Sequence, residues 1–249
     1  AKLPAPTFTR LAHAIGLHSY DQLRELCRND VLPDWTTLVG RAQALVDQAA
    51  GDDVPLFEQH AAAMMRNIQM LSERIKASKL SDAAKVLAKA RRVVLIGEMS
   101  ARGLAEYAAY IANMSLTGWQ VLGRTGDSLS SQLADLGPHD ACVVASISPY
   151  AARAVAMAGH VARCDVPIVA ITDNALSPLG PIAQHIFYVG TDSPQFFPSH
   201  VPSTLVFETL LDMVIRERGP EALEHIAAVE RQNHNLNEYW RDQPVRKNQ

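Results

Sequence analysis

The sequence predicts an α/β protein with a five-stranded parallel sheet flanked by helices. Five short apolar runs of strand composition recur along the chain, and helical patterns fill the intervals between them. This alternation is typical of parallel sheets, because two parallel strands need a crossover segment to join them. The runs lie at residues 92–97, 119–122, 141–146, 167–172 and 186–189. The first run ends at Gly97, and the loop after it carries Ser100.

Apolar stripes at helical spacing predict the helices. Residues 64–75 carry apolar side chains four, three and four residues apart, which indicates a long helix from Leu56. A second stripe runs through residues 206–214, and Gly219 marks the end of that helix. Shorter helices are expected over residues 36–49, 81–90, 104–111, 150–163, 178–184 and 221–239, and after the turn at 125–128.

Composition and charge exclude several classes of protein. The 249 residues are 48% hydrophobic and 20% charged with a formal net charge of -3, so any DNA contact would have to come from a local patch. Cys27, Cys142 and Cys164 lack the paired spacing of a metal site, which favours a reduced, cytoplasmic setting. No apolar stretch approaches the roughly 18 residues of a membrane span, so no membrane partner is expected.

Serine side chains follow the first and third predicted strands. Ser100 comes after the first strand, and Ser146 and Ser148 come at the end of the third. Ligands of open parallel sheets bind beyond the carboxyl ends of the strands, where the strand order reverses. Hydroxyl groups and the free N–H groups of helix starts bind phosphate or carboxylate there. The sequence therefore predicts an anion site, although a serine at such a junction can equally be a plain helix cap.

No cofactor, metal ion or catalytic residue is predicted. The segment after Gly97 lacks the second and third glycines of the dinucleotide fingerprint, so a nicotinamide cofactor is not expected. None of the nine histidines has a partner at metal-ligand spacing, and we expect them to be surface or packing residues. Glu98 stands where a carboxylate could act as acid or base, but a lone glutamate in a loop is usually solvated.

The first 30 residues are expected to form two short helices separated by Gly16. Thr7, Thr9 and Arg10 lie on the early turns of the first helix, where hydroxyl and guanidinium side chains can contact DNA. The alternative is an ordinary solvated helix face. Two helices of this size bury too little apolar surface to be stable alone, so they need a partner.

The order of these segments resembles one family of bacterial regulators. Residues 6–17 (PTFTRLAHAIGL) and 19–24 (SYDQLR) are similar to the recognition helix and the next helix of the head in RpiR-type, or MurR/RpiR, transcription regulators. Residues 84–218 resemble the sugar isomerase (SIS) domain that follows this helix-turn-helix head. The motifs ITDNALSPL at 171–179 and DSPQFFPS at 192–199 carry this part of the resemblance.

The resemblance implies a regulator that senses a phosphorylated sugar and binds operator DNA as a homodimer or tetramer. Its SIS domain would have a flavodoxin-like strand order. The implied segments are a partial head at 1–30, a connector and dimerisation helix at 31–80, the phosphosugar-binding domain at 81–218, and a C-terminal helix and tail at 219–249. In the family, supporting helices precede the recognition helix, so this form of the chain is expected to bind DNA poorly.

The first phosphate loop of that family is altered here. The family pattern is glycine, any residue, glycine, any residue, serine. This chain keeps Gly97 but has Met99 at the second glycine and Ala101 at the serine. Ser100, one place earlier, is then the hydroxyl that could serve.

The second phosphate loop keeps both of its leading serines but has lost two later donors. Pro149 replaces the family glycine and removes a backbone N–H, and Ala151 replaces the last hydroxyl residue. Tyr150 and Arg153 are additional polar groups at this rim. A sugar phosphate is the first ligand hypothesis, and another anionic metabolite held partly by Arg153 is the alternative.

Two other functional hypotheses remain. SIS domains also occur in aldose-ketose isomerases, and Glu98 and His200 would be the acid-base candidates for that reaction. The third hypothesis is a sensor or scaffold that assembles through the helix at 56–78 and has no DNA role.

Overall fold

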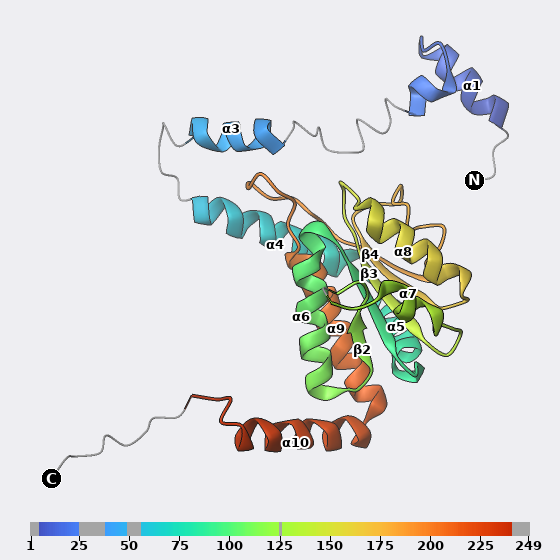
Figure 1. Ribbon diagram of the computed structural model, residues 1–249. Coiled ribbons are helices and arrows are strands. Elements are labelled where there is room, and N and C mark those ends of the chain that lie inside the picture. Colours follow the sequence, from blue (N-terminus) through green and yellow to red (C-terminus); the bar gives the residue numbers. More distant parts are fainter. Residues whose placement is uncertain (1–4, 25–37, 49–55, 125, 241–249) are drawn as a thin grey trace. The chain divides into compact units, whose positions relative to one another are not determined.

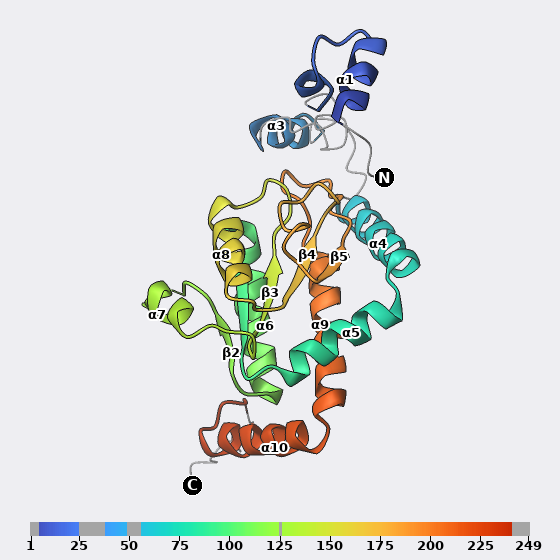
Figure 2. The same cartoon turned by 90° about the vertical axis from the view of Figure 1, so that its right-hand side faces the viewer.

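The computed structural model describes residues 5–24, 38–48, 56–124 and 126–240, and these fall into two units (Figures 1 and 2). The smaller unit comprises Ala1–Leu56 and Pro194–Phe197. The larger unit, called the body below, comprises Phe57–Ser193 and Pro198–Gln249. Cys27, much of the connector that the sequence places after residue 30, and the expected tail lie outside the described residues.

Two helical segments of the smaller unit pack around a glycine turn. The helices of this unit are α1 (Ala5–Ala14), residues 20–24 and α3 (Leu38–Gln48). Gly16 has a φ of 87°, which favours glycine, and it reverses the chain after α1. Ala12 and Leu23 are buried, and the rings of Phe8 and Tyr20 lie 5.8 Å apart. The predicted pair of short helices therefore forms.

The body is built on a five-stranded parallel sheet, as the sequence predicts. Its strands are β1 (Val93–Gly97), β2 (Trp119–Val121), β3 (Ala141–Ala145), β4 (Ile168–Thr172) and β5 (His185–Tyr188). They lie in the order β2-β1-β3-β4-β5, and every neighbouring pair is parallel. This is the expected flavodoxin-like order. Gly97 at the end of β1 lies opposite Ala145 at the end of β3.

Most of the predicted helices are present, with ends that differ by a few residues. They are α4 (Leu56–Arg74), α5 (Ala77–Lys89), the short 3-10 helix η1 (Met99–Ala101), α6 (Arg102–Ser115), α7 (Leu129–Ala134), α8 (Ala152–Arg163), α9 (Val201–Arg218) and α10 (Pro220–Asn235). The prediction of a helix over residues 178–184 is wrong. That segment consists of turns, because Pro181 has no N–H and restricts Gly180 before it.

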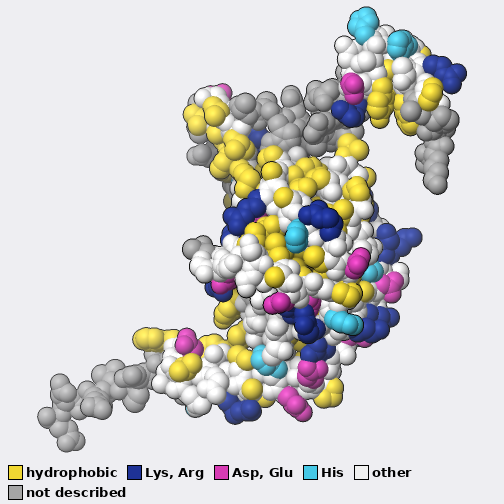
Figure 3. Space-filling model, turned by 45° about the vertical axis from the view of Figure 1, so that its right-hand side comes forward, with side chains coloured by type: hydrophobic (Ala, Val, Ile, Leu, Met, Phe, Trp, Pro, Cys, Tyr) yellow, Lys and Arg dark blue, Asp and Glu magenta, His cyan; other side chains and the backbone are white. Residues whose placement is uncertain are grey.

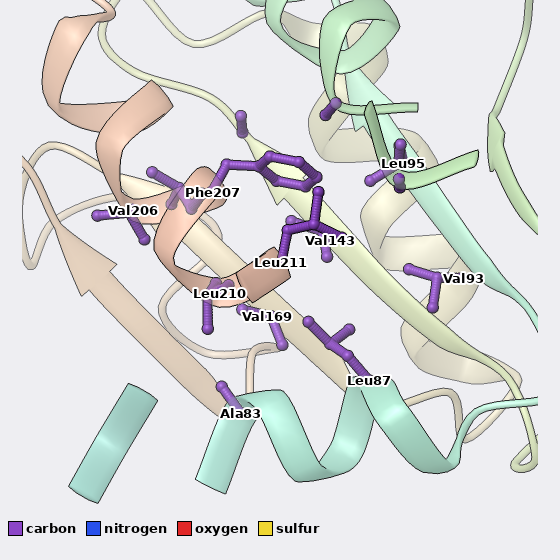
Figure 4. Packing of buried hydrophobic residues seen from close by; sticks show 14 of the residues in the cluster. Ala83, Leu87, Val93, Leu95, Val143, Val169, Val206, Phe207, Leu210 and Leu211 are labelled. Carbon is purple, nitrogen blue, oxygen red and sulfur yellow. The ribbon is translucent and has the colours of Figure 1, made fainter. Parts of the chain in front are cut away.

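Helices cover both faces of the sheet. Val93 and Leu95 of β1 point to the face covered by α5, α6 and α9, and Val94 and Ile96 point to the face covered by α7 and α8. Figure 4 shows Phe207 and its neighbours on α9 directed at the strands of the first face. The strands are thus buried on both sides, which explains why they are apolar throughout rather than alternating.

Candidate anion-binding site at the carboxyl edge of the sheet

The strand order places the two serine-bearing loops side by side. The order reverses at β1 and β3, because β2 lies on one side of β1 and β3 lies on the other. Since Gly97 and Ala145 are opposite each other, the loops that follow them leave the same edge of the sheet. The predicted binding edge is therefore the topological switch point of the fold.

The loop after β1 has a close-packed start and a strained second position. A Cβ on Gly97 would lie 2.4 Å from the carbonyl oxygen of Ala101, so only glycine fits there. Met99, in the place of the family glycine, has a φ of 52° and is 67% exposed. Ser100 follows in η1 and is an exposed residue at the sheet edge.

The loop after β3 is buried and held by β4. Ser146 donates its N–H to the carbonyl of Ile171 at 3.1 Å, and its own carbonyl accepts from the Thr172 hydroxyl at 2.7 Å. Ser148 is also buried, and its N–H donates to a carboxylate oxygen of Asp173 at 3.3 Å. This backbone donor, which phosphate loops present to the ligand, is thus engaged by the protein itself.

Asp173 organises the rim of the site. The Tyr150 hydroxyl donates to Asp173 at 2.8 Å and accepts from the Asn174 amide at 3.1 Å, and that amide also reaches Asp173. Burial, and then the bond to Asp173, raise the pKa of Tyr150 well above its ordinary value, so its hydroxyl stays protonated. Sequence reasoning missed Asp173 as a site residue, although it directly follows β4 at the same edge.

An arginine from each of two helix starts flanks Glu98. The carboxylate of Glu98 lies 3.7 Å from Nε of Arg153 and 3.9 Å from Nη1 of Arg102. Its side chain is only 14% exposed, so the expectation of a solvated glutamate is wrong. Within the described residues, its Oε1 has no hydrogen-bond donor. Arg102, which sequence reasoning did not single out, also donates to the carbonyl of Gly123 at 2.7 Å.

His200 joins the site across the fold. Its Nε2 lies 3.0 Å from the Ser100 hydroxyl, so the ring contacts the first loop. Burial lowers the pKa of His200, which keeps the ring neutral at pH 7. The sequence predicts a surface or packing role for this histidine, and gives it a functional role only under the isomerase hypothesis. Nothing in local spacing could reveal a partner 100 residues away.

The three residues that are predicted to contact DNA belong to the smaller unit. Thr9 and Arg10 are exposed on α1, and Thr7 is half-buried. Among the described residues, no group of three or more His, Cys, Asp or Glu side chains could hold a metal ion. None of the helices described is long and apolar enough to cross a membrane.

The fold is that of a doubly wound α/β domain, and its switch point carries the candidate anion site. The family model of the SIS domain matches residues 86–213, more than half of the chain. The chain belongs to the SIS domain family. A comparison with curated proteins finds no match.

Solved structures share the fold at low sequence identity. The sugar isomerase domain of an RpiR transcription factor from Sphaerobacter thermophilus is 22% identical, with a TM-score of 0.63 over 74% of this chain and 100% of that one. The NanR protein of Vibrio vulnificus, complexed with ManNAc-6P, is 18% identical, with a TM-score of 0.61 over 92% and 86%. A Methanococcus jannaschii protein, inferred to be a 3-hexulose-6-phosphate isomerase, is 15% identical, with a TM-score of 0.51 over 68% and 95%.

Proposed function

We propose that this protein is an RpiR-type transcription regulator whose body senses a phosphorylated sugar. The observation that carries the proposal is the meeting of the Ser100 loop with the buried loop of Ser146 and Ser148 at the switch point. Serine hydroxyls at that edge suit a phosphate. The domain of the Sphaerobacter transcription factor supports a regulator, and the Vibrio NanR protein, complexed with ManNAc-6P, supports a phosphorylated sugar as the effector.

The effector would bind through both serine loops and the rim. Ser100, Ser146 and Ser148 would hold the phosphate, and Tyr150 and Arg153 would contact the sugar or a second anionic group. Arg153 is 57% exposed and paired only loosely with Glu98, so it is available to an incoming anion. A ligand would also compete with Asp173 for the N–H of Ser148.

Ser148→Ala is expected to abolish stabilisation by the effector. A phosphorylated sugar at about 100 times its Kd should stabilise the folded protein by about 2.7 kcal/mol, which raises the melting temperature. The variant lacks the hydroxyl and should lose most of this increase. Thermal-shift measurements over a panel of sugar phosphates test this. Ser131→Ala, an exposed serine on α7, is the matched control and should respond like the wild type.

Two outcomes of this screen would contradict the assignment. A shift given by an unphosphorylated acid, with none from any phosphorylated compound, would favour the alternative anion held by Arg153. Turnover of a sugar phosphate would favour the second candidate function, an aldose-ketose isomerase. The contact of His200 with Ser100 and the largely buried carboxylate of Glu98, two residues before Ser100, are the observations that support that candidate.

The DNA role is proposed for the smaller unit, with Thr7, Thr9 and Arg10 as contacts. Both signs of charge are mixed over the face of the body in Figure 3, which gives no reason to place DNA there. Arg10 donates to the carbonyl of Pro6 at 3.4 Å, which holds its guanidinium near the helix start. A helix start with hydroxyl and guanidinium groups suits phosphate and base contact.

Arg10→Ala is expected to weaken DNA binding and to lower its salt dependence. Losing one phosphate contact should reduce the slope of log affinity against log salt by about one. Fluorescence anisotropy measures both quantities, with an operator selected by binding and a form of the protein that includes the supporting helices of the family's head. Arg216→Ala, an exposed arginine on α9 of the body, is the control and should keep the wild-type slope. An unchanged slope in Arg10→Ala would remove Arg10 from the interface.

Assembly as a homodimer or tetramer is part of the same proposal. α4 carries large apolar side chains that remain exposed, among them Phe57, Met65 and Ile68. Met65 and Ile68 are three residues apart and therefore share a face of the helix. These exposed side chains support a role for α4 as the dimerisation helix that the sequence predicts within residues 31–80.

A further inference from the structure

The residue that precedes α9 ties that helix to α4. Ser199 is buried, and its hydroxyl donates to the Sδ of Met64 at 2.9 Å. The same oxygen accepts the N–H of Val201, the first residue of α9, at 3.2 Å, so it also holds the start of that helix. A movement of Ser199 would therefore displace both the start of α9 and its contact on α4.

One turn further along α4, a second polar contact fixes the helix to the loop after β5. Asn67 is fully buried, and its amide donates to the carbonyl of Asp192 at 2.8 Å. A Cβ on Gly190 would come within 2.6 Å of the Asn67 side-chain oxygen, so the fit tolerates little displacement. Because Met64 and Asn67 are three residues apart, both contacts lie on one face of α4. The position of α4 on the body is thus set by two specific contacts.

The neighbour of Ser199 is His200, whose ring contacts Ser100 in the first loop of the anion site. We propose that occupancy of the anion site is transmitted to α4 through Ser100, His200, Ser199 and Met64. This inference rests on the proposed function in placing the effector at Ser100. It adds the route by which the body would act on the helix that leads, along the chain, toward the smaller unit.

Competition for the Ser100 hydroxyl drives the relay. The Nδ1 atom of His200 is buried and has no hydrogen-bond partner among the described residues. A ligand that takes over the Ser100 hydroxyl leaves the other nitrogen without its partner as well. Without the Ser100 contact the ring is no longer held in place, and it turns until its buried Nδ1 finds a partner, because an unpaired buried polar group is costly. Ser199 is joined to it by one peptide bond, so the contact with Met64 changes with it.

Hydrogen exchange of α4 tests the relay without any ligand. Ser100→Ala removes the same hydrogen bond, and we expect amides of α4 to exchange about fivefold faster or more, the lower end of ordinary coupling between sites. Ser131→Ala, the same substitution on α7, should leave α4 unchanged. Ser100→Thr keeps a hydroxyl and should restore the wild-type rate, which separates the relay from general destabilisation.

The intermediate residue is tested by a double variant. Ser199→Ala alone should speed exchange in α4, and adding Ser100→Ala to it should have no further effect, because both changes break one route. Wild-type exchange of α4 in Ser100→Ala, or effects of the two changes that simply add, would overturn the relay. Failure of every sugar phosphate to bind would refute the proposed function and leave this result standing. Binding of a sugar phosphate without any change in α4 would overturn the relay and leave the function standing.

Discussion

Gly97→Ala is expected to destabilise the body by about 2 kcal/mol, the usual cost of overpacking a well-packed site. The added methyl group would lie 2.4 Å from the carbonyl oxygen of Ala101 and 2.8 Å from the Cβ of Ala105. The first of these is a backbone atom of η1 directly before α6 and the second lies on α6, so relief requires both helices to move away from β1. The same movement would displace η1 and Ser100, and the variant should lose effector binding as well as stability.

The neighbouring Gly103 provides a matched control. It lies in α6, and no atom of another part of the body lies within 4 Å of the position of its Cβ. Gly103→Ala should therefore stabilise the protein by about 0.5 kcal/mol, because alanine is the better helix former. Urea unfolding of both variants measures the difference. Equal stabilities would show that the packing of Gly97 against α6 is looser than the structure indicates.

The sheet could be predicted in detail because its signal is local. Runs such as residues 93–97 and 168–172 are rich in β-branched residues, are buried on both faces and end at turn-forming residues. The strand order was implied by the family resemblance rather than by the runs themselves, since an apolar run does not specify its neighbours. The helix predicted at 178–184 does not form, because Pro181 lacks an N–H and disfavours helical geometry in the residue before it.

The candidate site was predictable only where its residues directly follow a strand. Ser100, Ser146 and Ser148 satisfy that rule, and the parallel register brings their loops to one edge. The same rule applied to β4 would also have indicated Asp173. His200 could not be found in this way, because it meets Ser100 only when α9 packs on the sheet.

Charge pairing was the least predictable property. Glu98 and Arg102 are four residues apart in a segment that contains a strand end and a 3-10 helix, so no helical pairing rule applies across it. Arg153 approaches from α8, more than fifty residues further on. A glutamate that looks solvated in sequence is therefore buried between two arginines that arrive from separate helices.

Asp140→Ala is expected to have the largest effect on stability, a loss of about 3 kcal/mol. Asp140 precedes β3, and its side chain is completely buried. Arg91 donates to both of its oxygens at 3.0 Å, and the N–H of Gly137 donates at 3.1 Å. Nε of Arg92 lies 3.4 Å away and is itself mostly buried. Removing the carboxylate leaves this arginine charge without a counter-ion in a site with little access to water, which is why the loss exceeds that of a surface pair.

The same carboxylate should make stability depend on acid in a defined direction. Burial by itself would raise the pKa of Asp140, but the bonds from Arg91 and Gly137 and the charges of Arg92 and Arg91 outweigh it, so the pKa lies below the ordinary value. The stabilisation by Asp140 is then fully present above the unfolded pKa of about 3.9 and is lost as the pH falls through the folded pKa.

Urea unfolding at pH 7 should show a large stability deficit for Asp140→Asn that shrinks below about pH 4. Asp82→Asn, an exposed aspartate on α5, should stay within about 0.5 kcal/mol of the wild type at both pH values. If the stability deficit of Asp140→Asn persists unchanged in acid, shape and hydrogen bonding rather than charge make Asp140 important. The protonated wild type would then keep an advantage over the variant that ionisation does not explain.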